Sequence, residues 1–147
     1  SILRINGHLF VHAGLSPQIM ESRLSLHEIN DAVRYFLNHP ERTDFNNVSR
    51  AALMGHNGPF WYRGYMEENH EYDHLPESEF EKILEYFNAK YIFVGHTNVK
   101  EITSLYNNRV FAVDVPFYSN LSRIQGLLLQ GDKIYVLNTS TGKNQIR

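Results

Sequence analysis

The sequence predicts an α/β fold in which helices flank a mixed sheet, and three observations lead to this prediction. Two short, uninterrupted apolar runs, residues 9–11 and 91–94, are typical of strands that are covered on both faces. Two segments with helical periodicity lie between these runs. Four short strand-like runs follow residue 94, which favours a layered domain with antiparallel strands added to the sheet.

Two helices are expected from capping patterns. The first begins at Ser25, where Glu28 three residues later completes a capping box, and it ends before Pro40. The second has the same pattern at Ser78 and Glu81, and it ends near residue 88. A third, shorter helix over about residues 48–54 has little periodic evidence.

The strand-like runs are separated by turn residues. They cover residues 102–106, 109–115, 124–130 and 133–137, with Asn107-Asn108 and Gly131-Asp132 between members of each pair. Such turns predict hairpins. The 147 residues contain no repeat or low-complexity linker, so we expect a single domain over residues 1–147.

Composition excludes several classes of function. The net charge is −2, so the chain lacks the excess of positive charge expected of a protein that binds nucleic acid or an anionic membrane surface. No cysteine is present, so disulfides and thiolate zinc sites are excluded. No apolar run approaches the roughly 20 residues of a membrane helix, and we expect a cytoplasmic protein.

Two histidines follow the two buried strands. His12 comes after residues 10–11 and His96 after residues 93–95, and small glycine or alanine residues flank both. Ligands of open α/β sheets bind beyond the carboxyl ends of strands, and neutral imidazole is a common metal ligand. A lone histidine is more often a buried, hydrogen-bonded residue, but the repeated context favours a metal site.

A two-metal centre needs more than two histidines, because it requires a bridging carboxylate and further ligands. Asp114 and Asp132 are the candidates in this chain. Asp114 falls in a strand-like run and Asp132 in a tight turn, so neither carries a strong ligand signature, and we interpret Asp114 as structural.

Three segments resemble, in order, motifs of the calcineurin-like metallophosphoesterases. They are residues 10–17 (FVHAGLSP), 58–65 (GPFWYRGY) and 94–97 (VGHT). The resemblance is greatest to the serine/threonine protein phosphatase branch, in particular bacterial phosphatases of the Shewanella-like type. It implies an α/β fold that is the C-terminal part of a layered metallophosphoesterase β-sandwich with flanking helices.

The resemblance also implies roles for three residues. His12 and His96 correspond to metal ligands, and Arg63 to an arginine that binds the substrate phosphate. Taken alone, Arg63 would be interpreted as a surface or ion-pairing residue, but a guanidinium matches two phosphate oxygens well. The cofactors implied are two divalent metal ions, manganese, iron or zinc.

Other family motifs are absent from the chain. The Asp-x-His, Gly-Asp-x-x-Asp-Arg and Gly-Asn-His motifs, which supply most metal ligands and the proton donor, would precede residue 1. We therefore expect residues 1–147 to be the C-terminal half of a phosphoesterase domain. The N-terminal half would lie in the same or a separate chain, and the 147 residues alone would have little activity.

The implied function is metal-dependent hydrolysis of a phosphoester, with a phosphoprotein as the expected substrate. The alternatives are a phosphohydrolase for small molecules or dinucleoside polyphosphates, and a non-catalytic phosphatase-like binding module. The aromatic and then acidic loop, residues 60–73, is expected to help select the substrate. Tyr118 is a further candidate for the wall of the cleft.

Overall fold

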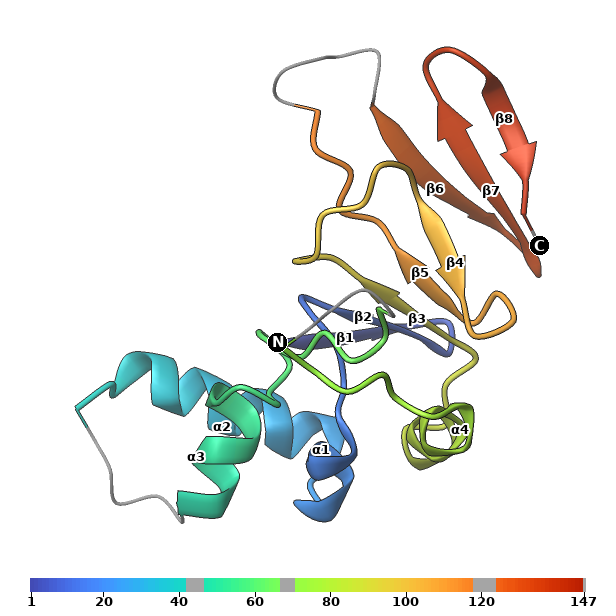
Figure 1. The fold of residues 1–147 in the computed structure, drawn as a ribbon. Helices are drawn as coiled ribbons and strands as arrows, with labels where there is room; N and C mark the ends of the chain where they lie inside the picture. Colours follow the sequence, from blue (N-terminus) through green and yellow to red (C-terminus); the bar gives the residue numbers. More distant parts are fainter. Residues whose placement is uncertain (42–46, 67–70, 118–123, 147) are drawn as a thin grey trace.

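The chain folds into a helical layer, a five-stranded sheet and a three-stranded sheet. The structure is a computed structural model and describes residues 1–41, 47–66, 71–117 and 124–146. Figure 1 shows the helices on one side of the larger sheet and the smaller sheet on the other. The elements in chain order are β1 (Ile2–Ile5), β2 (His8–Val11), α1 (Pro17–Glu21), α2 (Leu26–Asn38), α3 (Asn47–Met54), α4 (Glu77–Tyr86), β3 (Tyr91–Val94), β4 (Thr103–Leu105), β5 (Val110–Ala112), β6 (Gln125–Gln130), β7 (Lys133–Asn138) and β8 (Gly142–Gln145).

The larger sheet is mixed, as the sequence predicts. Its strand order is β1-β2-β3-β5-β4, with β2, β3 and β5 parallel and the two outer strands antiparallel to their neighbours. Val11 lies opposite Val94, and Val94 lies opposite Ala112. The three parallel strands therefore end at the same edge of the sheet, and this edge carries the candidate site.

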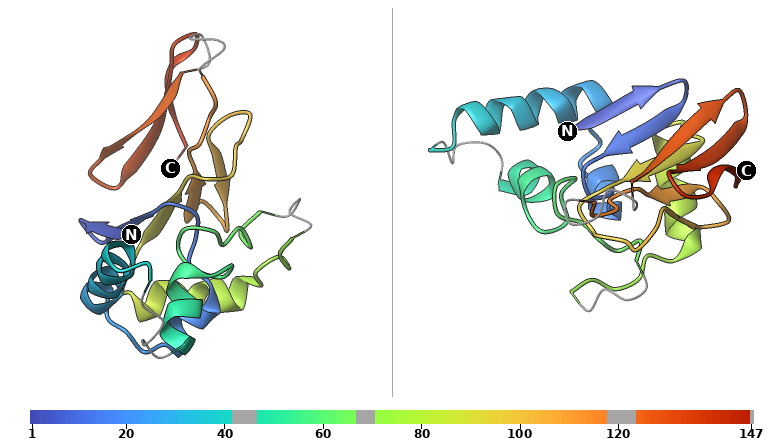
Figure 2. Two further views of the ribbon diagram at one scale, coloured as in Figure 1. Left: turned by 90° about the vertical axis from the view of Figure 1, so that its left-hand side faces the viewer. Right: turned by 90° about the horizontal axis from the view of Figure 1, so that it is seen from above.

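Alternate residues of the parallel strands face two different cores. Leu9, Ile92 and Val110 belong to the core between the larger sheet and the helices. Tyr91, Phe93 and Phe111 belong to a second core, where Ile134 of β7 packs against them. Because both faces of these strands are covered, they consist of continuous apolar runs. The left view of Figure 2 shows the smaller sheet, β6-β7-β8 (orange to red), at the end of the molecule away from the helical layer.

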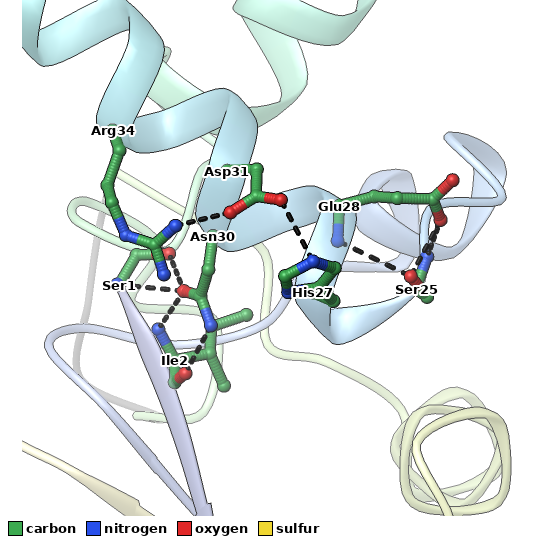
Figure 3. Close-up of polar contacts among 8 residues, drawn as sticks. All are labelled: Ser1, Ile2, Ser25, His27, Glu28, Asn30, Asp31 and Arg34. Atoms are coloured by element: carbon green, nitrogen blue, oxygen red, sulfur yellow. Dashed lines mark hydrogen bonds and ion pairs between the residues drawn. The ribbon is translucent and has the colours of Figure 1, made fainter.

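The capping box of α2 is confirmed. The Oγ atom of Ser25 accepts a hydrogen bond from the backbone N–H of Glu28 at 3.3 Å, and a carboxylate oxygen of Glu28 accepts one from the backbone N–H of Ser25 at 2.8 Å. Figure 3 shows this reciprocal pair at the start of the helix. The box satisfies two N–H groups that the helix itself leaves unpaired.

The side chain of Asn30 fastens α2 to the edge strand β1. Its Oδ1 atom accepts from the backbone N–H of Ile2 at 3.0 Å, and its Nδ2 atom donates to the carbonyl of Ile2 at 2.8 Å (Figure 3). The amide thus takes the place of a neighbouring strand for one residue of β1.

The capping box predicted at Ser78 and Glu81 is wrong. The N-cap of helix α4 lies two residues earlier, at Pro76, and it has no side-chain cap. The carbonyl of Pro76 already accepts the first hydrogen bonds of the helix, from the N–H groups of Glu79 and Phe80 at 3.0 Å each, so the helix starts before Ser78 could act as its N-cap. Ser78 then lies inside the first turn.

Other sequence predictions differ in extent. The strand expected over residues 109–115 ends at Ala112, because its neighbour β4 pairs only as far as Thr103 opposite Ala112. The short helix near residues 48–54 is confirmed as α3. Strands β1 and β8 and helix α1 were not predicted from the sequence. Among the described residues, no helix has the length and apolar character needed to cross a membrane.

Candidate active site at the carboxyl edge of the sheet

His12 and His96 meet where two parallel strands end. His12 directly follows β2, His96 comes two residues after β3, and these strands are hydrogen-bonded neighbours. The Nε2 atom of His12 lies 2.8 Å from the Nδ1 atom of His96. The predicted convergence of the two histidines is thus confirmed, whereas their role as metal ligands stays a prediction.

The backbone at His96 adopts an uncommon conformation. Its φ is +62°, in the left-handed region that few residues with a side chain enter. The N–H of the preceding Gly95 donates to the carbonyl of His12 at 2.9 Å, which ties the two turns together. Backbone conformations of this kind cluster at functional sites, where surrounding contacts hold them.

Arg63 contacts the histidine pair. Its Nη2 atom lies 2.8 Å from the Nε2 atom of His96, and its Nη1 atom lies 3.3 Å from a carboxylate oxygen of Glu71. The Nε atom of Arg63 is buried without a hydrogen-bond partner among the described atoms. Three chain segments that are far apart in sequence therefore supply one cluster.

The contacts determine the position of the proton on a neutral His96. A guanidinium can only donate hydrogen bonds, so the Nε2 atom of His96 must accept from Arg63. The ring proton then lies on Nδ1 and is donated to His12. The cluster forms a directed chain of hydrogen bonds from Arg63 through His96 to His12.

The surroundings lower the pKa of His96. Burial is the largest cause, followed by the positive charge of Arg63 and by His12, while Asp114 acts in the opposite direction. A lowered pKa favours the neutral imidazole, and only a neutral imidazole can bind a metal ion.

The two histidines fit the geometry of a partial metal site. Two imidazole nitrogens that bind one ion, each about 2.0–2.1 Å from it, lie roughly 3 Å apart. The 2.8 Å separation of the facing nitrogens is close to this value. In the parts of the chain that the structure describes, however, no group of three or more histidine, cysteine or acidic residues could hold a metal ion.

The two aspartates have different positions. Asp114 was expected within a strand, but it follows the end of β5. A Cβ atom built on Gly95 would lie 3.9 Å from the Cβ atom of Asp114. It therefore lies at the same edge as His96. Asp132 lies in the β6–β7 turn, 97% exposed and 3.8 Å from Lys90, away from the histidine pair.

The aromatic loop packs beside the two histidines. The ring of Trp61 is perpendicular to that of His96, with centroids 5.6 Å apart, and Phe60 lies 6.4 Å from His12. Trp61 is 51% exposed. It can therefore contact a ligand at this edge of the sheet.

The same loop is fastened to the turn after β2. Pro59 accepts a hydrogen bond from the N–H of Ala13 at 2.9 Å. The buried hydroxyl of Tyr65 donates to the carbonyl of Leu15 at 3.0 Å, and it also accepts from the N–H of Leu15 at 3.2 Å. Two of the three motif segments are thus held together by one backbone hydrogen bond and by the hydroxyl of Tyr65.

Tyr72 contacts two residues that precede Arg63 in the chain, His56 and Trp61. Its hydroxyl lies 2.8 Å from the carbonyl of His56 and 2.9 Å from the carbonyl of Trp61, and its ring stacks on His56. The aromatic and acidic loop was predicted from the sequence, but no sequence pattern singles out Tyr72 or Glu71. Residues 67–70 of the loop, and Tyr118, lie outside the described residues.

Comparison with known proteins reveals similarity to phosphatases. No family model matches the chain. Shewanella-like protein phosphatase 1 of Plasmodium berghei (strain Anka) is 29% identical over 119 residues, which are 77% of this chain and 31% of that protein. The chain thus spans about a third of this curated relative.

Solved structures agree with this similarity. The cold-active protein-tyrosine phosphatase of a psychrophile, Shewanella sp., matches 100% of this chain and 43% of its own chain, with a TM-score of 0.82 and 27% identity. Another structure of a cold-active protein tyrosine phosphatase has a TM-score of 0.76, also at 27% identity, and covers 100% of this chain and 42% of its own. The mixed α/β fold is therefore shared with a phosphatase.

Proposed function

We propose that the protein is a phosphoester hydrolase of the calcineurin-like type, and that His12, Arg63 and His96 form one wall of its active site. The observation that carries the proposal is the hydrogen-bonded chain from Arg63 through His96 to His12 at the carboxyl edge of the sheet. In this arrangement a guanidinium, a group suited to bind phosphate, lies beside two imidazoles, which are suited to bind metal. The phosphatase names of the similar proteins support it.

Arg63 is suited to bind the substrate phosphate. Its guanidinium carries a permanent charge and can donate two parallel hydrogen bonds to phosphate oxygens. Its side chain is 29% exposed, so an incoming phosphate can contact it while the surrounding loop holds it in place. Arg63 would thus orient the phosphoryl group next to the two histidines.

The proposal includes two divalent ions, manganese, iron or zinc. His12 through Nε2 and His96 through Nδ1 would be ligands, and the remaining ligands would come from polypeptide outside residues 1–147. When bound, such ions supply Lewis acidity toward water and phosphoryl oxygens. Ligation through Nδ1 would move the ring proton of a neutral His96 to Nε2, so the hydrogen bond that Nε2 accepts from Arg63 would have to be given up when the ions are bound.

A phosphoprotein is the proposed substrate. The motifs favour phosphoserine or phosphothreonine, whereas phosphotyrosine is the second candidate because the solved structures are named as tyrosine phosphatases. Exposed Trp61 beside His96 offers a surface for the residue that carries the phosphate. Hydrolysis of small phosphoesters alone, or binding without turnover, would favour the other two interpretations.

The test is to measure hydrolysis and metal content in the full-length protein. With manganese present, wild type should hydrolyse p-nitrophenyl phosphate and phosphopeptides, which are offered as phosphoserine and phosphotyrosine forms. Arg63→Ala should lower kcat/KM by about 10²–10³-fold with metal content unchanged, because it removes a group that stabilises phosphoryl charge. His96→Ala should lower both activity and bound metal.

Arg34→Ala is the matched control, because Arg34 is an exposed arginine on α2 that pairs with Asp31. It should behave like wild type. Loss of metal in Arg63→Ala would make Arg63 structural. Full activity in His96→Ala would contradict the proposed site.

A further inference from the structure

We infer that Trp61 selects the substrates of the proposed site, by binding an aromatic residue next to the phosphorylated serine or threonine. The inference rests on the proposed function and adds a substrate class to it. It is carried by the position of the Trp61 ring against His96, by the exposure of that ring, and by the contacts that hold its backbone.

The ring of Trp61 lies on the same histidine as the proposed phosphate-binding arginine. It is perpendicular to the ring of His96 with centroids 5.6 Å apart, while the Nη2 atom of Arg63 lies 2.8 Å from the Nε2 atom of His96. Two side chains from one loop therefore flank a single imidazole. A phosphate bound by Arg63 would bring the adjoining residues of its peptide close to the indole.

The loop leaves the Trp61 ring outside because the next residue takes the inner position. Tyr62 is 6% exposed and belongs to the core between the larger sheet and the helices, whereas Trp61 is 51% exposed. The N–H groups of both residues donate to the carbonyl of Gly58 at 3.0 Å, which forms a tight turn. An apolar side chain of a substrate would remove the exposed indole surface from water, and this burial is favourable.

The backbone of Trp61 is held in place by protein contacts on both sides. Its N–H donates to the carbonyl of Gly58, and its carbonyl lies 2.9 Å from the hydroxyl of Tyr72. The ring of Tyr72 stacks on His56 with centroids 4.0 Å apart. A tryptophan side chain has few rotatable bonds, so a fixed backbone leaves little conformational entropy to lose on binding. Trp61 is therefore preorganised to contact a ligand.

Most of this contact falls to a neighbour of the phosphorylated residue. The side chains of phosphoserine and phosphothreonine are short, so they can cover only a small part of the indole. Consecutive Cα atoms of a peptide are about 3.8 Å apart, which lets the adjoining side chain reach a ring beside the phosphate. Aromatic side chains gain most from such a contact, because they pair with an indole in stacked or edge-to-face arrangements.

The test compares two phosphoserine peptides that differ only in the residues next to the phosphoserine. One has phenylalanine and the other alanine on both sides, and kcat/KM is measured with the manganese-loaded full-length protein. Wild type should prefer the phenylalanine peptide by about 2- to 10-fold, the range of an aromatic pair, and mainly through a lower KM. Equal values for the two peptides overturn the inference without any variant.

Variants of Trp61 assign the preference to this side chain. Trp61→Ala should abolish it by lowering kcat/KM for the phenylalanine peptide alone, and Trp61→Phe, which keeps an aromatic ring, should retain a part of it. The inhibition constant of inorganic phosphate and the manganese content should match wild type, because Arg63 and the proposed ligands are unchanged. Tyr86→Ala is the matched control, since Tyr86 is an exposed aromatic residue at the end of α4, and it should keep the wild-type ratio.

The outcomes distinguish this inference from the proposed function. A preference that survives in Trp61→Ala, or an equal loss for both peptides in that variant, overturns the role of Trp61 and leaves the phosphatase proposal intact. Hydrolysis of p-nitrophenyl phosphate but of neither phosphoserine peptide contradicts the proposed substrate, and the inference fails with it. If none of the three compounds is hydrolysed, the phosphatase proposal itself fails. Circular dichroism that matches wild type establishes that each variant is folded.

Discussion

Gly14 allows the two main loops of the site to approach each other. A Cβ atom at this position would lie 2.8 Å from the backbone carbonyl oxygen of Tyr62 and 3.1 Å from its ring. Real Cβ atoms do not approach a backbone oxygen so closely, and the backbone cannot move aside as a flexible side chain could. The glycine between His12 and Pro17 is therefore a requirement of packing.

Gly14→Ala should consequently destabilise the protein by about 1–3 kcal/mol, because the added methyl group forces the loop of Tyr62 away from the turn after β2. Urea unfolding measures the effect. Gly126→Ala is the control, since a Cβ atom at Gly126 meets nothing within 4 Å, and its effect should stay within about 0.5 kcal/mol. Equal effects of the two substitutions would contradict the packing argument.

At the level of single residues, the sequence motifs predict His12, His96 and Arg63 but not how they interact. The direct contact between Arg63 and His96 depends on the path of a long loop, which no local pattern encodes. Glu71 falls in an acidic stretch where each carboxylate resembles the others. Its position on Arg63 follows from the anchoring of Tyr72, which only the fold reveals.

At the level of elements, α2 and α4 share one sequence pattern but begin in different ways. Both have serine followed by glutamate three residues later. In α2 the two side chains form the box, whereas in α4 Pro76 precedes Glu77 and starts the helix before Ser78. A capping pattern is therefore reliable only when no stronger start signal stands just before it.

Ser25→Ala should destabilise the protein by about 1 kcal/mol, because α2 loses the acceptor for a terminal N–H group. Ser78→Ala should have an effect within about 0.5 kcal/mol, because Ser78 is an exposed residue inside the first turn of α4. Thermal unfolding of both variants measures the difference. A greater loss of stability for Ser78→Ala than for Ser25→Ala would indicate that Ser78, and not Pro76, caps α4.

The strand predictions succeeded where apolar residues carry the signal. The run at residues 91–94 coincides with β3, and both turns that the sequence marks connect antiparallel neighbours. Strand β8 was missed because its four residues are polar and exposed, and it is defined only by its hydrogen bonds to β7. Such a strand has no hydrophobic pattern for sequence analysis to detect.

At the scale of the whole molecule, two buried phenols couple stability to alkaline pH. Burial raises the pKa of Tyr62 to about 12 and raises that of Tyr65 further. An unfolded chain ionises its tyrosines near pH 10, whereas the folded chain keeps these two neutral. Their contribution to the free energy of unfolding is fully present below pH 10. It is lost as the pH rises toward 12, because the unfolded state then binds fewer protons than the folded state.

The free energy of unfolding should therefore fall between pH 10 and pH 12, with Tyr62 contributing about 2 kcal/mol of the loss. Tyr62→Phe should reduce this loss, and Tyr86→Phe should leave it unchanged because Tyr86 is 41% exposed. Chemical denaturation at a series of pH values measures the difference. A pH profile that Tyr62→Phe does not alter would show that this phenol is not responsible.

If His96 acts in the proposed site, its left-handed backbone places stability and function under opposing selection. Glycine and asparagine enter this conformation more easily than histidine does, and the contacts of His96 are exposed or only partly buried. A library varied at residue 96 and screened for heat resistance alone should accumulate glycine and asparagine. The same library screened for turnover should retain histidine, so in laboratory evolution the two screens should diverge at this position.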